Sequence, residues 1–384
     1  MNVLQSARPE DVGMSSARLE HARAHAQRGA EELGCSGGGA VVIRHGRVVG
    51  EWYWGRRDQG AASQPFDAET MAPLASVTKG ITATALAMLL QDGALWLDDP
   101  VHRYIPELVD ARMSDAAANA RITVRHLATH SSGLPRGDRD WYDLYRQCPP
   151  DGDPYPLYVE GALLRIQHGL AFEPGTSHAY SDPAVCLLGE VLYRVTGQRV
   201  PALVQGRLFG PLGLQRIGWD FDEALAGDIS ASVEPGWGRA PASTPAFRRV
   251  GAPWGGLIGC GRDLAAFGLM LLHEGTLGGV RVLSPLAVRM MSSCQMPLPA
   301  RPLYPHRGLL WWIKAAPDTP ELGHLVPLGT YCHGGATHCV LVIMPALGIV
   351  AVMIRNRAGN PPGFVYNRDY PIFMDAVAGA VDDL

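Results

Sequence analysis

Lysine is nearly absent from this chain of 384 residues, in which only Lys79 and Lys314 are lysines among 33 lysine and arginine side chains. Arginine stays protonated in proteins, whereas a lysine amine can lose its proton when it is desolvated or placed near other cations. Lys79 follows Ser76 by three positions in the segment Leu74-Ala-Ser-Val-Thr-Lys-Gly80. We therefore interpret Lys79 as a candidate for proton transfer and Ser76 as its partner.

The sequence also lacks an apolar run of membrane-spanning length, and it lacks a basic amino terminus followed by an apolar stretch. These two absences predict a protein without membrane spans or a secretory leader, located in the cytoplasm. Its seven cysteines are odd in number and scattered, which fits reduced thiols rather than a disulfide framework. The cysteine pattern agrees with a cytoplasmic location.

A basic surface is missing as well, because the formal net charge is −4 and no cationic stripe with interleaved aromatic residues is present. We expect neither nucleic acid nor a membrane as a partner, and small molecules instead. Hydrophobic residues make up 47% of the chain and charged residues 18%, which is a globular composition. The oligomeric state does not follow from these numbers.

Patterns typical of β-strands gather at both ends of the chain. Residues 40–54 contain two β-rich runs around a His45-Gly46 turn, and residues 339–354 contain another such pair. Helices are predicted at 15–33, before the first hairpin, and at 370–381, after the second. This order predicts an antiparallel sheet that is built from both chain ends and flanked by helices.

The middle of the chain is mainly helical, with predicted helices at 160–168 and 184–196. We therefore predict an α+β fold of the three-layer α/β/α type with a helical insertion. The α/β domain is expected to comprise residues 1–80 and 250–384, and the helical domain residues 81–249. The active site is expected at the interface between the two.

Long Pro/Gly-rich loops at 133–157 and 229–256 interrupt the predicted helices. The first carries an aromatic-rich stretch from Trp141 to Tyr158 that is long for a simple connector. Two interpretations are open for this stretch. It is either a lid or pocket wall, or an ordinary packed surface loop.

The context of Ser76 favours a chemical role for it. The following residues, 81–90, are rich in helix formers and apolar on most sides, and Gly93 suits the position just after a helix. Ser76 is then expected at a helix N-terminus, where unpaired N–H groups favour a developing oxyanion, with Lys79 one turn further on the same face. The alternative is an N-capping serine followed by a solvated lysine.

Two further motifs occur downstream, Tyr180-Ser-Asp182 and His333-Gly-Gly335. Together with Ser76-x-x-Lys79 they form an ordered triplet, and the segments 121–135 and 255–268 add to it. In these motifs the chain resembles the serine hydrolases related to class C β-lactamases and D-alanyl-D-alanine peptidases, including carboxylesterases with the β-lactamase fold. The likeness extends from about residue 10 to the C-terminus.

The resemblance implies that Ser76 is the nucleophile that forms an acyl-enzyme, since a free hydroxyl needs help to attack a carbonyl. Lys79 and Tyr180 are implied to share the removal and return of its proton. A tyrosine can act as the base only if a cation such as Lys79 lowers its pKa. Which of the two takes the proton first stays open.

The third motif carries the remaining implied roles. His333, Gly334 and Gly335 resemble the substrate-binding motif on an edge strand, where glycine lets the backbone approach the substrate closely. The backbone N–H groups of Ser76 and Ala336 are implied to form the oxyanion hole. The resemblance implies no cofactor.

Asp182 departs from the family pattern, in which the second motif more often ends in Asn. An ionised carboxylate only accepts hydrogen bonds, and it is expected to hold Lys79 in its charged form and to repel an acidic substrate. A structural interpretation is equally open. Because Pro183 follows it, Asp182 also suits the N-cap of a helix.

A zinc site is the alternative for this region, because the segment Cys332-His-Gly-Gly-Ala-Thr-His-Cys339 has the residue types that zinc prefers. His333 already fits the third motif and Cys339 begins an apolar run, so buried structural thiols are favoured and no metal is predicted. His126 and His130 are expected to be hydrogen-bonded structural residues.

The sequence thus predicts a serine hydrolase that acts on a small-molecule ester or amide, most simply a carboxylesterase for short acyl esters. The same acyl-enzyme suits an acyltransferase, an amidase, a peptidase or a β-lactamase. A binding protein that keeps the fold without catalysis is the alternative from another class. Retention of Ser76, Lys79 and Tyr180 together favours an enzyme.

Overall fold

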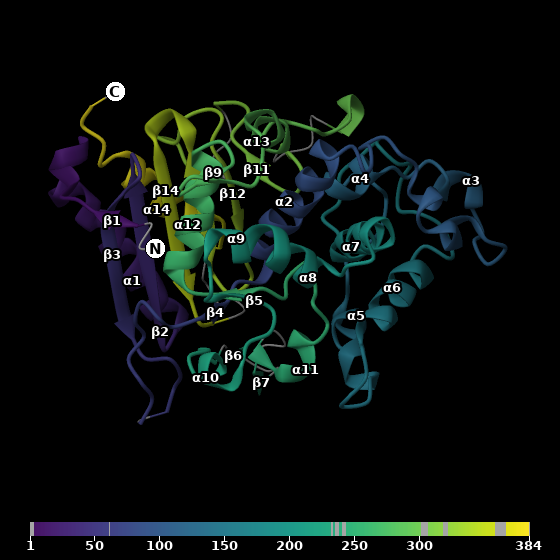
Figure 1. Cartoon of the computed structure of the whole chain (residues 1–384), viewed down its shortest axis with the longest axis horizontal. Helices are drawn as coiled ribbons and strands as arrows, with labels where there is room; N and C mark the ends of the chain where they lie inside the picture. Colours follow the sequence, from purple (N-terminus) through teal and green to yellow (C-terminus); the bar gives the residue numbers. More distant parts are fainter. Residues whose placement is uncertain are drawn as a thin grey trace.

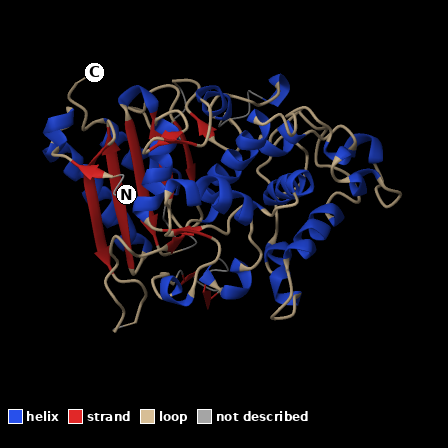
Figure 2. Ribbon diagram, viewed as in Figure 1, coloured by secondary structure: helices blue, strands red, loops and turns tan. Residues whose placement is uncertain are grey.

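The structure is a computed structural model that describes residues 4–60, 62–231, 233–234, 238–239, 243–300, 306–317, 322–357 and 366–383. A seven-stranded sheet lies on one side of the molecule, and helices fill the other side (Figures 1 and 2). The order of its strands is β1-β3-β2-β14-β13-β12-β11. Their bounds are β1 Gln5–Ser6, β2 Gly37–Arg44, β3 Arg47–Gly55, β11 Trp312–Ile313, β12 Tyr331–Gly334, β13 Val340–Met344 and β14 Ile349–Arg355.

The sheet joins the two ends of the chain, as predicted. β2 pairs antiparallel with β3 on one side and with β14 on the other, and β13 and β12 continue the antiparallel order. The pairing of β1 with β3 is parallel. Both predicted hairpins are present, and the left-handed conformations of His45 and Gly46 allow the tight turn of the first. The predicted fold class is confirmed.

Helices cover both faces of this sheet and give three layers. α1 (Ser16–Leu33) and α14 (Tyr366–Ala378) pack together on one face, and α12 (Gly261–Leu272) packs on the other. Successive residues of β2 enter opposite cores: Val41 belongs to the core beneath α12, and Val42 to the core beneath α1 and α14. This alternation follows from the two-residue period of a strand.

The helical part is built around α2 (Thr78–Gln91), which is buried along almost its whole length. α7 (Asp182–Thr196) matches the predicted helix at 184–196. The helix predicted at 160–168 is wrong in its bounds, because α6 spans Tyr155–Leu164, where Tyr155 and Tyr158 supply buried aromatic contacts at its start. The boundaries of the two predicted domains stay predictions.

The remaining elements are short. A three-stranded sheet of β4 (Ala72–Pro73), β8 (Ile258–Gly259) and β5 (Ile217–Gly218) leads directly to Ser76. The other bounds are α3 Ala116–Asn119, α4 Val124–Ala128, α5 Arg139–Tyr142, α8 Val200–Val204, α9 Gly210–Leu212, α10 Glu223–Ala226, α11 Pro245–Arg248, α13 Pro285–Met291, β6 Val233–Glu234, β7 Gly238–Arg239, β9 Thr276–Leu277 and β10 Val280–Arg281.

Of the loop predicted at 229–256, the structure shows β6, β7 and α11, while residues 232, 235–237 and 240–242 lie outside the described residues. Among the helices that the structure describes, none combines the length and the apolar character needed to cross a membrane.

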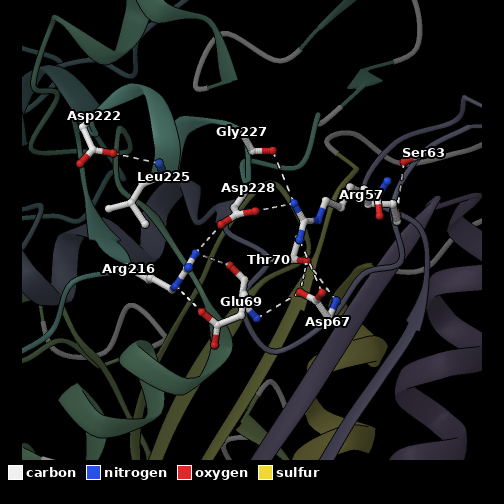
Figure 3. A network of polar contacts seen from close by, with 11 residues as sticks. Arg57, Ser63, Asp67, Glu69, Thr70, Arg216, Asp222, Leu225, Gly227 and Asp228 are labelled. Carbon is white, nitrogen blue, oxygen red and sulfur yellow. Dashed lines mark hydrogen bonds and ion pairs between the residues drawn. The ribbon is translucent and has the colours of Figure 1, made fainter.

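Charged side chains brace the small sheet that precedes Ser76. Asp228 lies between Arg57 and Arg216, with oxygen to nitrogen distances of 2.6 and 2.7 Å, and Arg216 also contacts Glu69 (Figure 3). Asp67 contacts Arg57 from the other side. The network joins the segment before β4 to the segment after β5 and so braces two of the three strands. Because its members are partly exposed, the benefit of each ion pair is modest.

A buried ion pair links the sheet to its outer helices. Arg355, at the end of β14, lies 2.6 Å from Asp369 of α14, and it also donates to the carbonyl of Ala26 in α1. His25 of α1 approaches the same carboxylate. Burial alone would raise the pKa of Asp369, but the hydrogen bond from His25 and the charge of Arg355 outweigh it and lower that pKa to about 2.

We predict that Asp369→Asn lowers the free energy of unfolding by about 3 kcal/mol, because it leaves the buried Arg355 charge uncompensated. A carboxyl whose pKa is lowered on folding stabilises the protein above its unfolded pKa. In the wild type this contribution is therefore full above about pH 4 and lost as the pH falls toward 2. Urea unfolding at pH 7 and pH 3 measures both effects. Asp382→Asn, which breaks an exposed pair with Arg18, is the control and should cost under about 1 kcal/mol; an equal loss in both variants would contradict the prediction.

Candidate active site

Ser76 lies in a 3-10 turn, Ala75–Val77, that runs straight into α2. Ala75 has a φ of 45°, a left-handed conformation that costs a residue other than glycine about 1 kcal/mol or more. The turn is held by its surroundings, since the Thr78 hydroxyl donates to the Ala75 carbonyl and accepts from the N–H of Leu257. Ser76 is thereby presented, partly exposed, at the start of the helix.

Lys79 is fully buried, with 0% of its surface exposed. Its Nζ lies 3.0 Å from Ser76 Oγ, 2.6 Å from Asp182 Oδ1 and 2.5 Å from the carbonyl oxygen of Trp254. An ammonium has three N–H donors and no acceptor, and three oxygens surround this one. The alternative of a solvated lysine is wrong.

Tyr180 reaches the same serine from the loop before α7. Its hydroxyl lies 2.9 Å from Ser76 Oγ, and Lys79 Nζ lies 4.8 Å from the centre of its ring. The ring stacks on His130 at a centroid distance of 4.5 Å, while His130 Nδ1 accepts the N–H of Ser181. The structure thus brings together the hydroxyl, the amine and the phenol, and His130 fixes the orientation of the phenol.

Asp182 is the first residue of α7, and of the two interpretations left open for it the helix cap is wrong. Ser181 is the N-cap, since its side chain accepts the N–H of Ala184. Asp182 turns away from the helix end, and its two oxygens contact Lys79 and the hydroxyl of Tyr142. Only 6% of its surface is exposed.

The charge of Asp182 decides the protonation of Lys79. Burial alone would lower the pKa of Lys79, but the neighbouring Asp182 carboxylate and the Tyr180 oxygen raise it further than burial lowers it. The pKa of Lys79 therefore lies above its usual value of 10.5. Lys79 carries its proton at neutral pH, as the sequence predicts from Asp182.

The third motif lies at the end of β12, beside the nucleophile. His333 is buried, its Nδ1 donates to the carbonyl of Gly334 at 2.7 Å, and burial with the charges of Lys79 and Arg307 holds its pKa well below the usual range. A Cβ atom on Gly335 would lie 2.4 Å from the carbonyl oxygen of Leu74, so only glycine permits this approach. Ala336 follows it and is exposed. The oxyanion hole formed by the N–H groups of Ser76 and Ala336 stays a prediction.

The residues weighed for zinc have other contacts. Cys339 lies against the carbonyl of Pro73 and accepts the N–H of Arg355, and Cys332 is part of the apolar core. His126 accepts the N–H of Thr123 and so closes a helix cap. In the part of the chain that the structure describes, no three His, Cys, Asp or Glu side chains gather as a metal would require.

Sequence reasoning missed three contributors to the site: the hydroxyl of Tyr142, the backbone carbonyl of Trp254 and the ring of His130. Tyr142 belongs to the aromatic-rich stretch that the sequence marks as unusual. Trp141 and Tyr158 of this stretch are buried against Trp254, and Tyr142 contacts Asp182, so the stretch packs against the site. A backbone carbonyl leaves no signal in the sequence.

We predict that Gly335→Ala lowers the rate at which a fluorophosphonate labels Ser76 by about 100-fold or more, because the added methyl group pushes β12 away from Leu74. Mass spectrometry of the labelled protein measures this rate, and the melting temperature reports the fold. Gly206→Ala is the control, since a Cβ there meets no atom within 4 Å. Unchanged labelling of the Gly335 variant would contradict the prediction.

Proteins similar to this chain include enzymes. Esterase EstB of Burkholderia gladioli is 35% identical over 215 residues, which cover 54% of this chain and 53% of EstB. An uncharacterised protein of Alkalihalophilus pseudofirmus is 27% identical over 367 residues, which cover 95% of this chain and 97% of that protein. The solved structure of EstCE1, described as a hydrolase with promiscuous acyltransferase activity, has a TM-score of 0.74 at 22% identity and covers 94% of this chain and 99% of its own.

The family model for beta-lactamases matches residues 22–372, which is most of the chain. This match agrees with the motif triplet, with the fold and with the meeting of Ser76, Lys79 and Tyr180. The chain belongs to the beta-lactamase family and is a serine hydrolase with the β-lactamase fold.

Proposed function

We propose that the protein is a carboxylesterase that cleaves short acyl esters through an acyl-enzyme on Ser76. The observation that carries the proposal is the double contact of Ser76 Oγ with Lys79 Nζ at 3.0 Å and Tyr180 Oη at 2.9 Å. The similarity to EstB, which is named an esterase, supports the choice of an ester as substrate.

The contacts of Lys79 support Tyr180 as the base. Burial lowers the pKa of Lys79, but Asp182 and the Tyr180 oxygen together raise it further, and a charged ammonium has no free electron pair to accept the Ser76 proton. In the proposed mechanism Tyr180 is the base, and it accepts that proton while Ser76 Oγ attacks the ester carbonyl. The oxyanion that forms is stabilised by the N–H groups of Ser76 and Ala336.

The rest of the cycle follows from the same groups. Tyr180 returns its proton to the leaving alkoxide, which departs as an alcohol and leaves the acyl group on Ser76. A water molecule then gives a proton to Tyr180 and attacks the acyl carbonyl, and the proton passes back to Ser76 Oγ as the acid leaves. In this mechanism Lys79 keeps its charge throughout, with the Asp182 carboxylate beside it. The proton moves only among side chains, water and substrate.

The proposal favours a neutral substrate. Asp182 is a fixed negative charge within the site, although Lys79 offsets much of it. A carboxylate on the substrate would meet this charge where the related motif more often places an uncharged Asn. Rings also lie beside the third motif, since Tyr180 and Trp312 lie near His333. Small uncharged acyl groups fit these surroundings.

We predict that the wild type hydrolyses nitrophenyl esters with a preference for short acyl chains, and that Ser76→Ala lowers kcat by about 1,000-fold or more because the nucleophile is lost. A panel of nitrophenyl esters of increasing acyl length measures the preference. Ser292→Ala, whose hydroxyl only donates to the Val288 carbonyl, is the control. Unchanged ester hydrolysis by the Ser76→Ala variant would contradict the proposal.

We predict that Asp182→Asn moves the acid limb of the kcat/KM profile to lower pH by about 1 unit or more. A negative charge raises the pKa of a neighbouring acid, and the active state must first lose the proton of the Lys79 and Tyr180 pair, so removing the charge lets the proton leave at lower pH. Profiles from pH 5 to pH 10 measure the shift. The wild type should turn over a chromogenic cephalosporin slowly or not at all, and the variant faster. A limb that stays or moves to higher pH would be evidence against the role of Asp182.

A further inference from the structure

Tyr142 lies behind the catalytic groups and has no role in the mechanism above. It ends α5, in the aromatic-rich stretch, and its hydroxyl donates to Asp182 Oδ2 while Lys79 faces Oδ1. The two oxygens of the carboxylate therefore have separate partners from separate parts of the chain. Burial and the charge of Asp182 raise the pKa of Tyr142, so its hydroxyl stays a donor at neutral pH.

Residues close to Tyr142 in the sequence pack against Trp254, whose carbonyl is another hydrogen-bond acceptor of Lys79. The ring of Trp254 packs 4.7 Å from Trp141 and 5.0 Å from Tyr158, and the carbonyl of the same Trp254 accepts from Lys79 Nζ. The Trp141 indole in turn donates to the Tyr158 carbonyl. Two of the three oxygens around Lys79 are thus supported by residues 141–158, which the catalytic motifs do not include.

We propose that Tyr142 is a positioning residue that acts through Asp182 on Lys79 and Tyr180. Its O–H group holds the carboxylate against the ammonium and takes up part of its negative charge. The proposal rests on the proposed function, since it assigns Tyr142 a part in the same proton transfer. It makes residues 141–158 a support for the base.

The direction of the effect follows from electrostatics. A hydrogen bond to an ionised carboxylate stabilises its charge, so the carboxylate attracts a proton on its neighbours less strongly. Without the Tyr142 hydroxyl, Asp182 holds the proton of the Lys79 and Tyr180 pair more firmly. The acid limb of the kcat/KM profile then moves to higher pH, opposite to the shift expected when the charge of Asp182 is removed.

The other charged and titratable groups near this site do not change in such a variant. His130 and His333 stay neutral, because burial and the charges of Arg307 and Lys79 hold their pKa values well below the usual range. Arg307 lies over the Tyr180 ring at 5.8 Å and keeps its charge. Arg136 acts on Tyr142 from the preceding loop, and Cys186 of α7 has a pKa far above its usual value because it is buried.

Tyr142→Phe tests the proposal, because it removes the hydroxyl and keeps the ring that packs 5.3 Å from Trp141. We expect the acid limb to move to higher pH by about half a unit to 1 unit. In the Asp182→Asn background the same change should move the limb by much less, since no charge remains for the hydroxyl to stabilise. Tyr104→Phe is the matched control, because that hydroxyl also donates to a carboxylate, Asp99, at 2.6 Å, and Asp99 pairs with Arg103 instead of Lys79.

One further measurement keeps this test separate from the proposed function. The pH dependence of the rate at which a fluorophosphonate labels Ser76 reports the base even if no ester is cleaved. If the wild type is labelled but hydrolyses no ester, the proposed carboxylesterase function is overturned. The role of Tyr142 is then tested by comparing the labelling rates of the variants. If Tyr142→Phe left the acid limb of the kcat/KM profile in place, the role of Tyr142 would be overturned. The same holds if Tyr142→Phe moved the limb equally far with and without Asp182→Asn. A shift in Tyr104→Phe as large as in Tyr142→Phe would also overturn it.

Discussion

The site depends on one buried ammonium. A fully buried lysine loses its hydration and would give up its proton unless oxygen atoms replace the water. Here the replacements come from three distant parts of the chain: Ser76 before α2, Asp182 at the start of α7, and the carbonyl of Trp254 in the loop before β8. Placing all three around one nitrogen holds these three segments together at that nitrogen. Proton transfer and the packing of these segments thus share one constraint.

The features that could be predicted from the sequence are those with local patterns. The hairpins β2–β3 and β13–β14 show period-two apolar runs around turns, and α1 and α2 show helix formers with clear ends. Ser76, Lys79 and Tyr180 were found because each belongs to a short motif and the three motifs occur in a fixed order. Their meeting in space was implied by a resemblance, and composition or spacing alone would not have produced it.

What the sequence could not show depends on contacts between distant segments. Asp182 was open to a capping role because Asp before Pro is a local signal, yet Ser181 caps the helix and Asp182 pairs with a lysine more than a hundred positions away. α6 starts earlier than its pattern indicates because Tyr155 and Tyr158 gain burial there, which outweighs local preference. Trp254 contributes its backbone carbonyl to the site, and the backbone is the same for every residue type.

The pairing of Asp182 with Tyr142 also explains how one position can change charge without losing its place. A phenol oxygen both donates and accepts, so it can bond either one carboxylate oxygen of Asp or the amide nitrogen of Asn, and in both cases one side-chain oxygen is left to face Lys79. Asp and Asn have nearly the same shape, so the packing of α7 against α2 need not change. An exchange of Asp and Asn at position 182 therefore changes the charge and keeps the geometry. A difference in the proton chemistry of two such enzymes at this position would measure the charge alone, and Tyr142 is the group that makes both residues fit.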